Sequence, residues 1–96
     1  MTIYELLNAK REEILSIAER HGVGNVRIFG SVARGEASEA SDVDFLVQVG
    51  SHPSAWFPAG LILDLEELLG CKVDIVTEDS IYWLLRRKIL KEAIPL

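Results

Sequence analysis

The feature that most restricts the fold of this chain is a glycine-serine turn followed by a pair of aspartates. The apolar run 26–29 leads into Gly30 and Ser31, and after ten further residues Asp42 and Asp44 open a second apolar run. Runs of this kind are typical of short buried strands. Strand residues i and i+2 point to the same face, so we expect Asp42 and Asp44 to project together, about 7 Å apart along the strand.

Two carboxylates on one face favour a bound cation. They repel each other and lose hydration unless a positive charge lies between them. Hard oxygen ligands at this spacing suit Mg²⁺, which usually keeps some waters and shares phosphate oxygens with its substrate. Gly30 lets a phosphate approach the backbone closely, and Ser31 offers a hydroxyl and an N–H near an expected helix start.

The pattern G-S-x10-D-x-D resembles the nucleotidyltransferase superfamily, which includes DNA polymerase beta, poly(A) polymerases and aminoglycoside nucleotidyltransferases. The fuller pattern is most similar to the minimal nucleotidyltransferases, small prokaryotic proteins commonly paired with HEPN-domain toxins. It reads Gly30-Ser31-x-Ala33-Arg34-Gly35 and then Ser41-Asp42-Val43-Asp44. The resemblance extends from Val26 to about Ile94. It implies an α+β, two-layer nucleotidyltransferase fold in a single domain, 1–96.

A third acidic residue lies further along the chain. Asp74 stands inside the short apolar run 72–76, where a carboxylate is unfavourable unless it is paired or metal-bound. Members of the superfamily carry a third metal-binding acid on the strand beside the D-x-D strand, and the resemblance assigns that role to Asp74. The alternative is an edge-strand aspartate that points to solvent.

The resemblance implies two Mg²⁺ ions and ATP as substrate. One ion would be held by Asp42, Asp44 and Asp74 and would lower the pKa of the attacking hydroxyl. The other, held by Asp42 and Asp44, would bind the triphosphate and stabilise the leaving pyrophosphate. Asp74 could also accept the hydroxyl proton.

Three residues near the turn complete the implied nucleotide site. Gly30 and Ser31 would cradle the β- and γ-phosphates, and Arg34 is a candidate to neutralise phosphate charge. The rival role for Arg34 is a structural ion pair with Glu36 or Glu39.

The implied function is transfer of AMP from ATP to a tyrosine hydroxyl of a cognate HEPN toxin, which would make the protein an antitoxin. One alternative is a binding module that neutralises its partner by contact. Another is transfer to a small molecule such as an aminoglycoside, against which the missing acceptor domain counts. Five residues of the implied site are present as the pattern requires, namely Gly30, Ser31, Asp42, Asp44 and Asp74, which favours the enzyme.

Net charge, cysteine content and hydropathy narrow the classes of protein to which this chain can belong. A formal charge of −5 argues against a dedicated nucleic-acid binder, and the single cysteine, Cys71, rules out an internal disulfide. Cys71 is expected to be a buried structural thiol. We find no secretory leader and no run of membrane-spanning length, so a cytoplasmic protein is the default expectation. Assembly into a homo- or hetero-oligomer is left open by the sequence.

The expected element order is α-β-α-β-α-β-α with three strands in a mixed sheet. Thr2 and Glu5 form a capping box that starts the first helix, and Gly22 and Gly70 are expected helix stops. The expected ranges are helix 2–20, strand 26–29, helix 31–35, loop 36–41, strand 42–49, loop 50–58, helix 61–69, strand 72–76 and a helix from 79 or 80 to 93.

Some side chains allow more than one interpretation. His21 is expected to complement a helix dipole rather than to act as a ligand. Trp56 and Phe57 are expected in the core, with base stacking or a partner interface as alternatives. The last helix is expected to turn five apolar residues inward, namely Ile81, Leu84, Leu85, Ile89 and Ala93. Its basic cluster is expected to be a solvated face or a partner- or phosphate-binding patch, and comprises Arg86, Arg87, Lys88 and Lys91.

Overall fold

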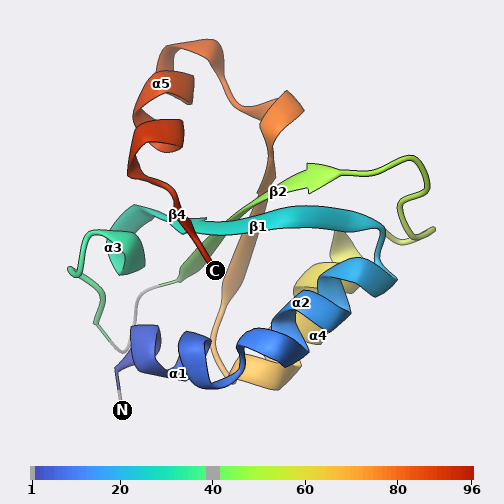
Figure 1. Cartoon of the computed structure of the whole chain (residues 1–96), viewed down its shortest axis with the longest axis horizontal. Coiled ribbons are helices and arrows are strands. Elements are labelled where there is room, and N and C mark those ends of the chain that lie inside the picture. Colours follow the sequence, from blue (N-terminus) through green and yellow to red (C-terminus); the bar gives the residue numbers. More distant parts are fainter. Residues whose placement is uncertain (1, 39–41) are drawn as a thin grey trace.

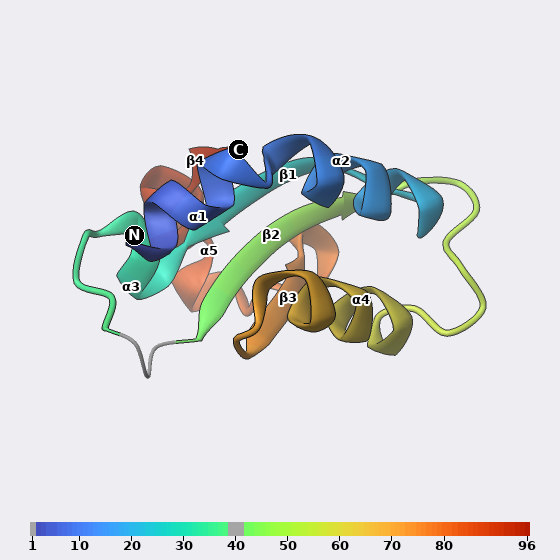
Figure 2. The same ribbon diagram turned by 90° about the horizontal axis from the view of Figure 1, so that it is seen from below.

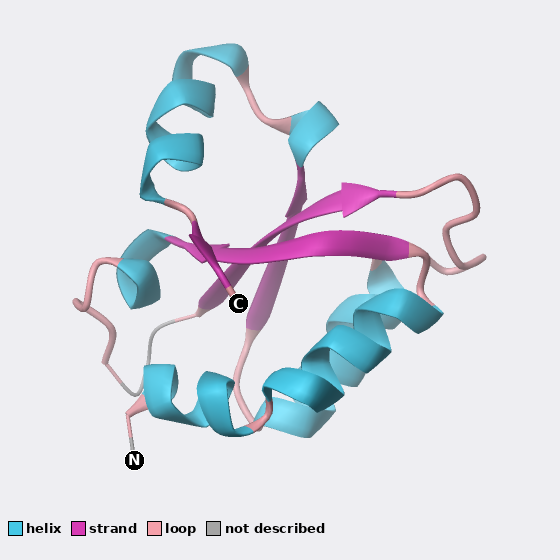
Figure 3. Ribbon diagram, in the orientation of Figure 1, coloured by secondary structure: helices cyan, strands magenta, loops and turns pink. Residues whose placement is uncertain are grey.

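The computed structural model describes residues 2–38 and 42–96, so the expected end of the 36–41 loop, with Glu39 and Ser41, lies outside the described residues. Figures 1 and 3 show the arrangement of helices and strands. The elements are α1 (Ile3–Ala9), α2 (Arg11–Arg20), β1 (Val23–Phe29), α3 (Gly30–Ala33), β2 (Val43–Val49), α4 (Ala59–Leu69), β3 (Val73–Thr77), the 3-10 helix η1 (Glu78–Ser80), α5 (Trp83–Glu92) and β4 (Ile94–Pro95). The expected order of helices and strands is confirmed as far as α5, with the first helix divided at Lys10 and the short η1 inserted before α5.

The sheet is mixed, as expected, but it has a fourth strand that the sequence did not predict. The strand order is β3-β2-β1-β4. β1 is antiparallel to both β2 and β4, whereas β2 and β3 are parallel. β4 has two residues, one of them Pro95, so it carries no alternating pattern and no usual strand composition.

Local signals set the ends of the first helices. The Thr2 hydroxyl accepts a hydrogen bond from the Glu5 N–H at 3.1 Å, and the Glu5 carboxylate accepts one from the Thr2 N–H at 3.4 Å, so the capping box is confirmed. Gly22 follows α2 with φ +78°, and a Cβ there would lie 2.3 Å from the His52 carbonyl oxygen. Glycine is therefore required by both backbone angle and space.

The hydrophobic core lies on one face of the sheet, which α1, α2 and α4 cover (Figures 1 and 2). Val43, Phe45 and Val47 of β2 all face this layer, as their alternation predicts, and none is more than 1% exposed. The buried residues of the core cluster are Leu7, Ile14, Ile17, Ala18, Val23, Val26, Ile28, Val32, Val43, Phe45, Val47, Leu61, Leu65, Leu69 and Val73. Cys71 is half-buried and packs against this cluster.

α5 lies on the other side of the sheet (Figures 1 and 2), and no residue from 83 to 92 is buried. The prediction that Leu84 and Leu85 face the core is wrong: they are 59% and 50% exposed. The reason lies in the segment before the helix, because η1 and the extended residues 81–82 carry the chain away from the sheet before α5 begins. Ile89 and Ala93, nearer the return to β4, are half-buried.

The two aromatic residues of the 50–58 loop differ. Phe57 packs against the core as predicted, but Trp56 is 80% exposed, so core packing of Trp56 is wrong. Neighbouring side chains of this loop point in different directions, and only Phe57 of the two points into the core.

In the part of the chain that the structure describes, we find no helix long and apolar enough to span a membrane.

Candidate active site

Two carboxylates face each other across the parallel pair of strands. Asp44 of β2 is the register partner of Asp74 of β3, and adjacent strands lie about 4.8 Å apart. Because Val43 and Phe45 face the core, Asp44 faces the opposite side, towards α5. The expectation that Asp74 lies on the strand beside the D-x-D strand is confirmed. Asp74 is also exposed and on the edge strand, as the alternative interpretation expected, and its role as a metal ligand stays a prediction.

Gly30 lies directly against Asp44. Phe29, the last residue of β1, pairs with Asp44, and Gly30 follows with φ +75°. A Cβ on Gly30 would lie 2.2 Å from Oδ2 of Asp44. The glycine therefore supplies a conformation that other residues rarely adopt and keeps open the space beside the carboxylate. Ser31 follows it in α3 and is half-buried.

Asp42 completes the acidic group. It is exposed, precedes β2 directly and stands two residues before Asp44. Burial raises the pKa of Asp44, and the charges of Asp74 and Asp42 raise it further, while Arg34 opposes the shift. The acidic group is thus a region of unfavourable negative potential that a cation would relieve.

Arg34 forms ion pairs on the same side of the molecule. Its Nε donates to the Glu36 carboxylate at 3.0 Å, and its Nη1 donates to the Glu92 carboxylate of α5. The expected pair with Glu36 is confirmed, whereas Glu39 lies outside the described residues. The Arg34 side chain is 42% exposed, so it remains accessible to an anion.

Glu92 is a site residue that the sequence did not indicate. Its side chain is only 14% exposed, and its charge also raises the pKa of Asp44. In the sequence it follows the basic residues of the last helix, and its position there carries no motif. Only the three-dimensional return of the chain from α5 to β4 brings it to Arg34 and Asp44.

The donor set fits a hard divalent cation. Among residues 2–38 and 42–96, no three His, Cys, Asp or Glu side chains are already arranged around a metal position. Asp44 and Asp74 nevertheless supply neighbouring carboxylates, and Gly30 keeps the adjacent space free. Mg²⁺ takes only one or two protein carboxylates in many phosphate sites and completes its shell with water and substrate oxygens. The residues present therefore match what a metal-nucleotide complex requires.

His21 belongs to a separate cluster at the other end of the sheet. Its Nδ1 is 2.7 Å from Ser54 Oγ, and its Nε2 is 2.7 Å from Asp64 Oδ2. Val23, near this cluster, pairs with Val49, the last residue of β2, whereas Asp44 lies at the beginning of β2. His21 does cap α2, but its ring also holds the 50–58 loop to α4.

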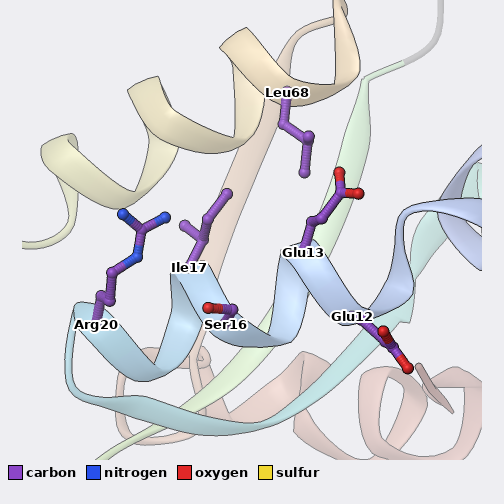
Figure 4. A pocket seen from close by; sticks show the side chains of 6 residues that line it. All are labelled: Glu12, Glu13, Ser16, Ile17, Arg20 and Leu68. Carbon is purple, nitrogen blue, oxygen red and sulfur yellow. The ribbon is translucent and has the colours of Figure 1, made fainter.

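A hollow of about 380 Å³ lies between α2 and α4 (Figure 4). Its lining residues are Glu12, Glu13, Ser16, Ile17, Arg20 and Leu68. None of the residues that the sequence singled out for chemistry is among them. This hollow is on the helix-covered side of the sheet and is not part of the acidic group.

Comparison with known proteins identifies the family of this chain. The chain belongs to the nucleotidyltransferase domain family, whose model matches residues 11–96. It is similar to the protein adenylyltransferase MntA of Thermococcus cleftensis, with 39% identity over 92 residues, 96% of this chain and 90% of the relative. The protein is accordingly a nucleotidyltransferase enzyme.

Solved structures agree with the fold. A structure of a candidate minimal nucleotidyltransferase has 51% identity and a TM-score of 0.87, and the match covers 100% of this chain and 97% of the other. A crystal structure of a toxin–antitoxin with AMP-PNP has a TM-score of 0.74 over 88% of this chain and 69% of the other. That likeness, at 20% identity, is one of fold.

Proposed function

We propose that this nucleotidyltransferase transfers AMP from ATP to a protein hydroxyl, a tyrosine of a cognate HEPN-domain toxin, and thereby acts as an antitoxin. The observation that carries the proposal is the register pair Asp44 and Asp74 beside the open space at Gly30. The resemblance of the chain to a protein adenylyltransferase supports a protein as the acceptor.

The turn would bind the polyphosphate. Gly30 lets phosphate oxygens come close to the backbone, and the adjacent Ser31 offers a hydroxyl and an N–H. Arg34, whose side chain is 42% exposed, would contact a phosphate in place of Glu36 or Glu92. A guanidinium matches the geometry of a phosphate as well as that of a carboxylate.

The acidic group would hold two magnesium ions and orient the nucleotide. Asp42, Asp44 and Asp74 are the residues that would hold them, and the bound ions would neutralise phosphate charge and lower the pKa of the attacking hydroxyl. The acceptor oxygen forms a bond to the α-phosphorus as the bond from that phosphorus to the bridging oxygen breaks. Asp74, exposed on the edge strand, accepts the hydroxyl proton, and pyrophosphate leaves.

Two findings support the class of acceptor, the first a protein and the second a toxin. One relative is named for protein adenylylation, and one fold neighbour was solved as a toxin–antitoxin with an ATP analogue. The open approach to Asp74, which is exposed on the edge strand, would admit a side chain delivered by another protein.

A toxin and its antitoxin paired as proposed here would be encoded side by side, so the test is transfer to the purified product of the neighbouring gene. We would incubate both proteins with ATP labelled on the α-phosphate, with Mg²⁺ or EDTA, and measure the intact mass of the acceptor. We expect one or more AMP increments with Mg²⁺ and none with EDTA or with the Asp74→Asn variant. Protection of cells by Asp74→Asn, with no nucleotide on the acceptor, would instead establish neutralisation by contact.

A further inference from the structure

We propose that the start of α5 is the docking surface for the acceptor protein, and that the acceptor presents apolar and acidic side chains to it. We call this the α5 surface; it comprises Tyr82, Trp83, Leu84, Leu85, Arg87 and Lys88. The proposal rests on the proposed function for the identity of the acceptor. It extends that function by assigning where the acceptor binds and which chemistry it must carry.

The α5 surface is apolar and open to solvent. Four consecutive residues are large and exposed: Tyr82 by 59%, Trp83 by 72%, Leu84 by 59% and Leu85 by 50%. The rings of Tyr82 and Trp83 lie with centroids 6.1 Å apart. Residues three or four apart lie on one face of a helix, so Trp83 and Leu84 share a face with Arg87 and Lys88. Isolated exposed apolar residues are common on protein surfaces, whereas apolar residues that lie together mark interaction sites, where tryptophan and tyrosine often dominate the binding energy.

Polar contacts hold α5 in place without burying its apolar residues. Near its start, Arg86 Nη1 donates to the Glu78 carbonyl oxygen at 2.8 Å, and the Glu78 carboxylate pairs with Arg27 of β1 at 3.1 Å. At its last residue, Glu92 pairs with Arg34. A ten-residue helix with no buried residue is marginal by itself, so these contacts fix a surface that a partner can complete.

Charge indicates what kind of partner fits. α5 carries four cations, Arg86, Arg87, Lys88 and Lys91, and one anion, Glu92. The helix is therefore formally +3 in a chain of −5. A complementary surface carries carboxylates around an apolar centre. A two-fold contact between two α5 surfaces would instead oppose Arg87 and Lys88 with their own copies, which disfavours a second copy as the occupant.

The position of the α5 surface relative to the acidic group indicates that this partner is the acceptor. Glu92 ends α5, bonds to Arg34 and acts electrostatically on Asp44. A helix of ten residues is about 15 Å long, so a protein docked on the first turns of α5 lies within reach of the site. Figure 1 shows α3, which begins at Gly30, beside the later turns of α5.

The experiment measures binding and transfer with the purified product of the neighbouring gene as the probe. The test variants are Trp83→Ser/Leu84→Ser and Arg87→Glu/Lys88→Glu. The matched controls are Trp56→Ser/Leu63→Ser, whose parent side chains are 80% and 64% exposed, and Arg20→Glu. We expect each test variant to weaken the calorimetric Kd by at least about tenfold, with a matching loss of transfer, and the controls to stay near the parent.

The readouts separate this proposal from the proposed function. The thermal shift of each test variant by ATP and Mg²⁺ should equal that of the parent, since the changes lie outside the acidic group. Transfer and Kd unchanged in the test variants would overturn the docking proposal and leave the function standing. Binding that depends on α5, with no transfer by the parent, would support docking and overturn the function.

Three further results would overturn the docking proposal. The first is that the probe does not bind the parent. The second is a dimer of the chain alone, seen by sedimentation, that Trp83→Ser dissociates; this would assign the α5 surface to a second copy. The third is binding of the parent, but not of Arg87→Glu/Lys88→Glu, to phosphatidylglycerol vesicles, which would assign the surface to a membrane.

Discussion

The two faces of the sheet differ in what they bury. On the face covered by α1, α2 and α4, Phe45 and its neighbours two residues away on β2 are almost fully buried and apolar. On the other face the same strand presents Asp44 and Leu46, and β1 presents Arg27. Because strand side chains alternate, one strand contributes to the core with one set of residues and to the candidate site with the other.

The second face contains electrostatic arrangements that do not favour folding. Asp44 has a raised pKa because it is partly buried near other carboxylates. Arg27 pairs with Glu78, yet its Nη2 is buried with no hydrogen-bond partner among the described residues. Unpaired buried polar atoms are unfavourable by about 1–3 kcal/mol. The comparison indicates that the helix-covered face supplies the stability and the other face the chemistry, and five measurements can test this division.

The largest expected effect is on activity. Asp44→Asn keeps the shape of the side chain but removes a charge from both proposed metal positions. We expect transfer to fall by about three orders of magnitude, since catalysis of phosphoryl transfer depends mainly on positioning and charge stabilisation. Transfer to the acceptor would be measured by intact mass, with Asp79→Asn, an exposed residue of η1, as the control. Transfer close to that of the parent would remove Asp44 from the site.

The second expected effect is on stability and concerns the core face. Phe45→Ala should lower the free energy of unfolding by about 3–5 kcal/mol, because it leaves a cavity in the core cluster. Leu46, its equally buried neighbour on the other face, lies outside that cluster, so Leu46→Ala should lower it by less, about 2 kcal/mol. Urea titrations compare the two. An equal or larger loss for Leu46→Ala would mean that the second face contributes as much to the free energy of unfolding as the core face does.

The third expected effect, at Gly30, is a loss of both activity and stability. Gly30→Ala adds a Cβ that would clash with Asp44 Oδ2 at a residue with positive φ, so we expect a loss of about 2 kcal/mol in stability together with a large loss of transfer. Gly35 has φ +74° but open space, and Gly24 has neither constraint. Gly35→Ala therefore measures the backbone strain alone, and Gly24→Ala is the neutral control. Equal effects at Gly30 and Gly35 would show that the close approach to Asp44 is unimportant.

A smaller effect is expected in the pH dependence of stability. The pKa of Asp44 is raised in the folded state, so the folded chain holds this proton more tightly than the unfolded chain does. Stability from this group is present at pH below its unfolded pKa and is lost as pH rises through the folded pKa. In EDTA, Asp44→Asn should lack this loss and be more stable than the parent at neutral pH. A less stable variant at neutral pH would contradict the sign of this shift.

Much of the fold and of the site followed from local sequence. The capping box, the glycine stop after α4 and the alternation of β2 are short-range signals, and each predicts the element observed. The positions of Asp44 and Asp74 also followed, because the resemblance placed Asp74 on the neighbouring strand, and the structure pairs the two in register. The proposed roles of these residues in metal binding remain predictions.

What the sequence did not reveal depends on contacts between distant segments. The helical periodicity of 81–93 indicated an inward apolar face, but periodicity does not say whether a core lies beneath it, and for Leu84 and Leu85 none does. Glu92 reaches Arg34 across 58 positions of sequence, so no local pattern could indicate the pair. The same limit applies to β4, whose pairing with β1 defines a two-residue segment as a strand.

The smallest expected effect concerns this pair of Glu92 and Arg34. Glu92→Gln removes one negative charge beside the acidic group and releases part of Arg34 for phosphate, while Glu36 still holds the guanidinium. We expect the KM for ATP to fall by about two- to fivefold with little change in kcat. This fall corresponds to a gain of about 0.5–1 kcal/mol in the free energy of nucleotide binding.

Glu36→Gln is the matched control, because it removes the other carboxylate that pairs with Arg34. The Glu36 side chain is 64% exposed and that of Glu92 only 14%, so solvent screens the charge of Glu36 more strongly and its removal should change KM less. Steady-state kinetics at several ATP concentrations compare the two variants. If Glu92→Gln raises KM instead, the carboxylate orients Arg34 for the nucleotide rather than competing with it. If the two variants behave alike, the position of Glu92 at the end of α5 has no special influence on the site.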